Sequence, residues 1–165
     1  MRERLRRAED LLAAAEAALM TALLAVMICL AFGQVVLRHF GSGLLWAETV
    51  LKHSVLWTGF LGAALAARAE KHFAWEAAHL GASERLKPWL RLASSTAAAG
   101  VTAFLFKASW VYCADERASG AALLTLGALT VPAWIASAGI PAGFALMLIH
   151  FLFRTADAAA EAARK

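Results

Sequence analysis

Four long apolar stretches occupy most of this 165-residue sequence. They cover about residues 11–37, 44–67, 89–112 and 132–153. A helix of about 20 apolar residues crosses the core of a bilayer, and a helix satisfies its own backbone hydrogen bonds where water is absent. The sequence therefore predicts an all-α integral membrane protein with four transmembrane helices. We expect residues 1–165 to form a single membrane domain.

The composition agrees with a membrane protein and excludes the main alternatives. Hydrophobic residues make up 61% of the chain and charged residues only 17%, whereas soluble domains average about 25% charged residues. Too few charges remain to cover the surface of a soluble domain. The net charge of +4 does not indicate a nucleic-acid-binding protein, because long uncharged segments separate the basic residues.

The basic residues lie mainly on one side of the predicted membrane segments. Twelve Lys and Arg side chains belong to the N-terminus, to the loop at 68–88 with the start of the third segment, and to the C-terminus. On the other side lie only Arg38 and Arg117. Because cytoplasmic loops carry the excess of Lys and Arg, we expect both termini and the 68–88 loop to be cytoplasmic. The loop at 113–131 is expected outside.

Three charged side chains fall inside the predicted segments, where an ionisable group is costly and raises a functional hypothesis. Glu48 and Lys52 are four residues apart in the second segment, a spacing that favours a salt bridge within a helix. Lys107 lies in the third segment at a depth similar to that of Glu48, so these two could also pair across helices. A proton or ion path is one interpretation. We favour a structural ion pair or side chains that reach the outer interface, because no series of carboxylates crosses the bilayer.

Two histidines inside the segments, His53 and His150, raise the question of haem ligation. Counted at ~1.5 Å per residue, their depths differ by roughly 13 Å, which argues against a shared haem. The sequence also lacks the motifs of phosphate binding, metal-dependent hydrolysis and nucleophilic catalysis. We therefore predict no cofactor, no metal site and no enzymatic activity.

Small residues recur at a spacing of four in two of the segments. The fourth segment contains Gly139 and Gly143 on either side of Pro141, and the second contains Gly59 and Ala63. Such pairs let helices approach closely. Pro141 has no N–H, so it frees a backbone carbonyl and is expected to kink its helix.

Several short motifs lie around the first turn and in the last segment. They read RHF at 38–40, LWAE at 45–48, LW at 56–57, FLGAA at 60–64, VPAW at 131–134 and IPAGFALM at 140–147. In combination, these motifs and the four-segment hydropathy resemble the small membrane subunit (DctQ type) of the TRAP transporters, the tripartite ATP-independent periplasmic transporters. The resemblance covers nearly the whole chain.

This resemblance implies a multi-pass protein of the bacterial inner (cytoplasmic) membrane with both termini inside and the 113–131 loop in the periplasm. It also implies two protein partners: a large permease subunit that carries the substrate and sodium sites, and a periplasmic substrate-binding protein. The small subunit would be a non-transporting scaffold. It would support the large subunit and help to dock the binding protein during sodium-coupled uptake of organic acids.

The resemblance also carries roles over to individual positions. Arg38, Trp46, Glu48 and Trp57 stand at signature positions of the family, and Lys52 stands where the family often has arginine. Our structural and interaction candidates are these five residues together with Lys107, Gly139, Pro141 and Gly143.

Two further positions bear on the resemblance. Glu76 stands where the family often has an acid after its histidine. Thr49 stands where the family often has a second acid directly after Glu48, so the contribution of that carboxylate is absent here or comes from another residue.

Two other functions stay open at the level of sequence. A small self-sufficient proton-coupled exporter would need a carboxylate embedded in the membrane, and Glu48 is the only candidate deep enough for that role. A membrane anchor of a redox enzyme would need haem ligands at matched depth, which the histidines do not offer.

Overall fold

The computed structural model of the chain describes residues 2–69, 87–126 and 129–163. Most of the expected cytoplasmic loop at 68–88, including Glu76, lies outside the described residues. The two parts of the chain that flank this loop are both helical.

Within the described residues, four helices are long and apolar enough to cross a membrane. They are α1 (Arg2–His39), α2 (Leu45–Ala69), α4 (Lys87–Ser119), and a fourth helix formed by α5 (Ala133–Ser137) with α6 (Gly139–Ala162). The predicted number and order of spanning helices are therefore confirmed. α1 and α4 are longer than their apolar segments because the flanking residues, rich in Arg, Glu and Ala, are strong helix formers.

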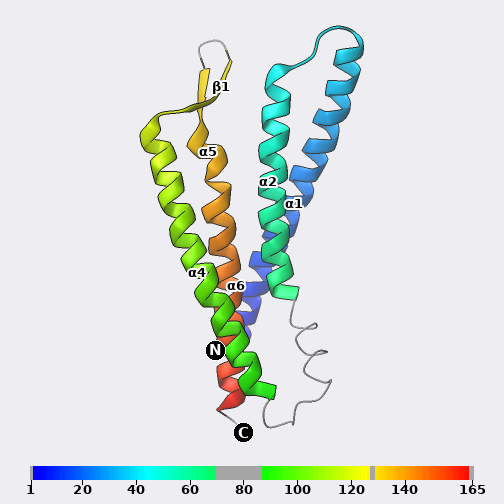
Figure 1. The fold of residues 1–165 in the computed structure, drawn as a ribbon. Helices are drawn as coiled ribbons and strands as arrows, with labels where there is room; N and C mark the ends of the chain where they lie inside the picture. Colours follow the sequence, from blue (N-terminus) through cyan, green and yellow to red (C-terminus); the bar gives the residue numbers. More distant parts are fainter. Residues whose placement is uncertain (1, 70–86, 127–128, 164–165) are drawn as a thin grey trace.

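The helices run alternately in opposite directions, so both termini lie at the same end of the bundle (Figure 1). We call this end the terminal end. The opposite end, where α1 turns into α2 and a β-hairpin follows α4, is the hairpin end. The predicted cytoplasmic side corresponds to the terminal end.

The segment between α4 and α5 is not a plain loop, as the sequence had predicted for 113–131. Its first residues continue α4 to Ser119, and an antiparallel hairpin of β1 (Ala122–Leu126) and β2 (Leu129–Pro132) follows. Leu124 pairs with Val131 and Thr125 with Thr130. The β-branched and apolar residues of this stretch favour strand pairing. The hairpin leads directly into α5, where the Ala133 N–H donates to the Ala121 carbonyl at 2.8 Å.

The fourth spanning helix is interrupted at Ala138, between α5 and α6. Pro141 lies three residues later and cannot donate a hydrogen bond to the carbonyl of Ser137, four residues before it. The helical bonds resume at once, since the Ala142 N–H donates to the Ala138 carbonyl at 3.1 Å. Pro141 was expected to kink its helix, and the structure shows a short interruption at Ala138 with helical hydrogen bonds on both sides of it.

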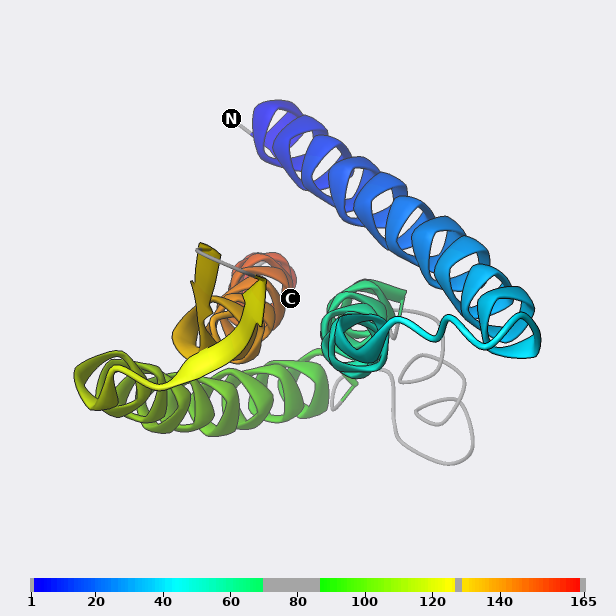
Figure 2. The ribbon, with the colours of Figure 1, turned by 90° about the horizontal axis from the view of Figure 1, so that it is seen from above.

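α6 is the centre of the bundle and packs against both α4 and α2. α4 turns a face of small residues toward it, with Ser95, Ala99, Thr102 and Ser109 buried at helical spacing. α1 packs mainly on α2 and crosses the bundle at its edge (Figure 2). None of the residues in the apolar 18-residue window of α1 is buried, against 33% in the α5–α6 helix. The first helix is therefore the least covered part of the bundle.

Candidate functional site

α2 and α6 pack against each other in a contact that we call the α2–α6 joint. The predicted signature residue Trp57 belongs to it. Its indole N–H donates a hydrogen bond to the Ala136 carbonyl at 3.0 Å, across 79 positions of sequence. Ala136 belongs to α5, next to the break at Ala138, where the helical backbone is interrupted. Trp57 thus connects α2 to the interrupted part of the fourth spanning helix.

The two glycines of the fourth span lie at the same joint. A Cβ atom added at Gly139 would lie 2.6 Å from the Trp57 ring, and one added at Gly143 would lie 2.4 Å from the Cβ of Phe60. Phe60 also contacts Phe144 edge to face, with ring centroids 5.2 Å apart. The close approach that the glycine spacing predicts is therefore made within the chain, between α6 and two aromatic side chains of α2.

The small residues of α2 behave differently. A Cβ added at Gly59 would meet no atom within 4 Å, and Ala63 is exposed. One face of α2 is open along its length, and its exposed members are Leu45, Glu48, Lys52, Val55, Gly59, Ala63 and Ala66. We call these seven residues the open face of α2.

The turn between α1 and α2 is held by one side chain. The Gln34 amide donates to the Leu44 carbonyl at 2.9 Å and accepts from the Leu44 N–H at 3.2 Å. Gly41 supports the tight turn with a φ of 75°, a value that favours glycine. Arg38 is exposed in the last turn of α1 and Trp46 is half-buried in the first turn of α2, so two signature positions flank this turn.

Glu48 and Lys52 form the predicted salt bridge within α2, with 2.9 Å between carboxylate and ammonium. Both side chains are more than 70% exposed. Lys107 is exposed on α4 and forms no salt bridge with Glu48, so the pairing across helices that we considered is wrong. The physical reason is the packing order, because α6 lies between α2 and α4 and keeps their side chains apart.

A second polar cluster, which the sequence analysis did not predict, lies near the terminal end. His150 of α6 is completely buried, and its Nε2 lies 3.1 Å from both carboxylate oxygens of Glu16 on α1. Its Nδ1 is buried without a hydrogen bond and lies 4.0 Å from a Glu9 oxygen. With Ala13, the two glutamates form the buried face of α1, at spacings of four and three residues.

Two arginines make further polar contacts at this end. Arg68, at the end of α2, pairs with Asp10 and lies 3.9 Å from Glu9. Arg91 of α4 pairs with Glu161 of α6 at 2.7 Å. Charged contacts therefore join α1 to α2 and α4 to α6 where the helices leave the apolar region. We call Glu9, Asp10, Glu16, Arg68 and His150 the terminal-end cluster.

The sequence held a signal for this cluster that single-residue arguments missed. Glu16 and His150 both lie close to the predicted cytoplasmic ends of their spans, so their depths match. The two histidines inside the segments have different partners, and His150 contacts Glu16. His53 instead donates from Nδ1 to the Thr49 carbonyl of its own helix at 2.8 Å. A comparison of the acidic residues with the histidines by their depth in the membrane would have predicted the contact between Glu16 and His150.

Comparison with known proteins identifies the family. The model of the family described as "Tripartite ATP-independent periplasmic transporters, DctQ component" matches residues 27–161, which is 135 of the 165 residues. No curated protein matches the chain significantly. The matched region begins within α1 and includes α2, α4 and nearly all of α6. The chain therefore belongs to the DctQ family and is a small membrane component of a TRAP transporter.

Proposed function

We propose that this chain is a non-transporting scaffold of its TRAP transporter. It supports the large permease subunit in the bacterial inner membrane and helps to dock the periplasmic substrate-binding protein. The transported substrates are organic acids, taken up with sodium, and both the substrate and the ion are bound by the large subunit.

The observation that carries this proposal is the exposure of the apolar side chains of α1. The apolar part of α1 has no buried residue within the chain, and large side chains such as Ile28, Phe32 and Val35 are about 70% exposed. The open face of α2 lies beside it and bears the Glu48–Lys52 salt bridge. A protein partner in the membrane would cover α1 and supply polar surroundings for that ion pair.

The charged groups favour a scaffold over a self-sufficient exporter. Among the described residues, Glu48 is paired within its own helix at the hairpin end, whereas Glu16 and His150 lie near the terminal end. No described carboxylate lies between these two clusters in the spanning helices. A proton-coupled exporter would need such a group to carry protons through the apolar region.

Affinity purification of the tagged chain from native membranes tests the proposal. We expect the large permease subunit to be recovered with it. Gly59→Trp, which fills the open face of α2, should reduce this recovery several-fold. Gly100→Trp on α4 is the matched control, because both glycines are exposed and a Cβ at either meets no atom within 4 Å.

Two results would contradict the proposal. Recovery of the wild-type chain alone, or with a redox enzyme and no large permease, would exclude a scaffold subunit. Equal recovery with Gly59→Trp and Gly100→Trp would place the contact away from the open face of α2.

The orientation of the chain is a separate prediction. Twelve basic residues belong to the N-terminus, the 68–88 loop with the start of α4, and the C-terminus, against Arg38 and Arg117 in the other two connections, and this distribution favours a cytoplasmic terminal end. We expect a reporter fused to either terminus to be active only in the cytoplasm. A terminus that an impermeant reagent labels from the periplasm of intact cells would reverse this topology.

A further inference from the structure

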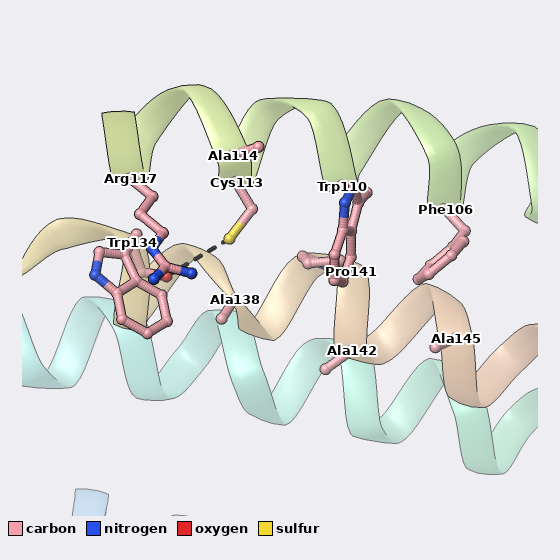
Figure 3. A pocket seen from close by; sticks show the side chains of 10 residues that line it. All are labelled: Phe106, Trp110, Cys113, Ala114, Arg117, Trp134, Ala138, Pro141, Ala142 and Ala145. Carbon is pink, nitrogen blue, oxygen red and sulfur yellow. Dashed lines mark hydrogen bonds between the residues drawn. The ribbon is translucent and has the colours of Figure 1, made fainter. Parts of the chain in front are cut away.

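A groove runs between α4 and α6 toward the hairpin end, with a volume of about 420 Å³ (Figure 3). Its walls are apolar and include Phe106 and Trp110 of α4 and Pro141, Ala142 and Ala145 of the fourth spanning helix. The groove is open along one side. None of the contacts proposed above for the scaffold function uses it.

One positive charge lies at the end of this groove. The Arg117 guanidinium lies 5.4 Å from the centre of the Trp134 ring, which holds it over the groove mouth (Figure 3). Within the described part of the chain, Arg117 forms no salt bridge with a carboxylate. It is the only charged side chain among the residues that line the groove. The site is therefore apolar along its length and cationic at one end.

The length of the groove matches one leaflet of a bilayer. From Phe106 to Arg117 the α4 axis rises by about 16 Å, at ~1.5 Å per residue, and half of the hydrocarbon core is about 15 Å thick. With the third segment at 89–112, Phe106 lies about 9 Å inside its outer end and Arg117 about 7.5 Å beyond it, at the level of the lipid headgroups. Trp110 and Trp134 lie along the same path, and tryptophan is common near membrane interfaces.

We propose that this groove binds one anionic phospholipid, with an acyl chain along α4 and α6 and its phosphate beside Arg117. A helix of a partner protein would need an acidic residue at the level of Arg117 to match this charge, whereas every phospholipid carries a phosphate at headgroup depth. A single acyl chain is narrow enough, and the arginine supplies charge-assisted hydrogen bonds to a phosphate.

Native mass spectrometry of the purified full-length chain tests the site. The chain is incubated with phosphatidylglycerol or phosphatidylcholine of the same acyl composition. We expect phosphatidylglycerol to be retained about tenfold more, because Arg117 can bind the phosphate of either lipid but is repelled by the choline cation that only phosphatidylcholine carries. Arg117→Gln should remove this preference. Arg38→Gln, which removes one exposed charge from the same end of the bundle, should keep it.

A second pair of variants tests the acyl-chain part of the groove. Ala142→Trp should abolish retention of both lipids, whereas Ala103→Trp, at an exposed position elsewhere on the membrane face of α4, should not. Circular dichroism and gel filtration verify that each variant folds, and Ala145→Phe replaces Ala142→Trp if the latter does not. Inorganic phosphate does not occupy the acyl-chain part of the groove, so its binding would be unaffected by Ala142→Trp or Ala103→Trp. Loss of binding with Ala142→Trp therefore distinguishes a lipid from a free anion.

Three outcomes would overturn the proposal. They are equal retention of the two lipids by the wild-type chain, unchanged retention by a folded groove-filling variant, and a polypeptide adduct in native membranes. The last is measured with a photo-crosslinking residue at Ala142, for which we expect an adduct with the mass of a phospholipid.

Discussion

Gly143→Ala is expected to lower the free energy of unfolding of the purified chain by about 1–3 kcal/mol, the usual cost of overpacking a close contact. The added Cβ would lie 2.4 Å from the Cβ of Phe60 and 2.6 Å from its ring. Because the nearest atom is attached to the backbone of α2, rotation of the Phe60 side chain cannot relieve the clash. α2 and α6 must move apart. Thermal unfolding in detergent, followed by size-exclusion chromatography, measures the effect.

Gly59→Ala is the matched control for this change. Gly59 lies in a spanning helix, but a Cβ added there meets nothing within 4 Å. The same substitution should leave stability unchanged or raise it slightly, since alanine is the better helix former. Equal destabilisation by the two variants would show that the contact with Phe60 does not determine the effect.

Gly139 offers an independent check on the same joint. Here the nearest atoms are those of the Trp57 indole ring, at 2.6–2.8 Å. Trp57→Leu removes that ring, so in its presence Gly139→Ala should lower the stability of the chain much less. We expect the double variant to be more stable than the sum of the two single effects predicts, although it also loses the hydrogen bond to Ala136.

The sequence predicted the spanning helices well because length and hydrophobicity suffice for that purpose. It also predicted the Glu48–Lys52 bridge, since both residues lie on one helix and their spacing determines the geometry. Contacts between helices were harder. Gly139 and Gly143 indicated a close approach, but nothing in their spacing identifies Trp57 and Phe60 of α2 as the partners.

The incorrect pairing of Glu48 with Lys107 and the unpredicted contact of His150 with Glu16 have the same physical origin. The pairing of Glu48 with Lys107 required α2 and α4 to be neighbours, and depth alone cannot show that α6 separates them. To predict the contact between His150 and Glu16, one must know that the first and last helices meet near the terminal end. Depth in the membrane limits which residues can pair, and the packing order then selects among them.

His150→Leu is expected to be the most damaging single change near the terminal end. It would leave the carboxylate of Glu16, with a side chain only 3% exposed, without its partner. Leaving a buried polar group without its hydrogen-bond partner usually costs about 1–3 kcal/mol, and more where the group is charged. Among residues 7–39 of α1, the buried ones are Glu9, Ala13 and Glu16, so we also expect this end of α1 to separate from α6.

Two measurements follow this change in a background where Cys29 and Cys113 are replaced by serine. Thermal unfolding reports stability, and electron paramagnetic resonance reports the distance between spin labels at Ala15 of α1 and Ala159 of α6, both exposed. We expect a lower melting temperature and a longer, broader distance distribution. An unchanged distribution together with wild-type stability would show that the terminal-end cluster does not hold α1.

Two further variants separate the loss of the His150–Glu16 contact from a general effect of losing a histidine. His53→Leu removes a half-buried histidine that bonds only a carbonyl of its own helix, so its effect should be much smaller. The double variant His150→Leu with Glu16→Leu removes both polar groups and should recover much of the lost stability. If it is as unstable as the two single effects combined, the two side chains do not act as a pair, and α1 is held mainly by its contacts with α2.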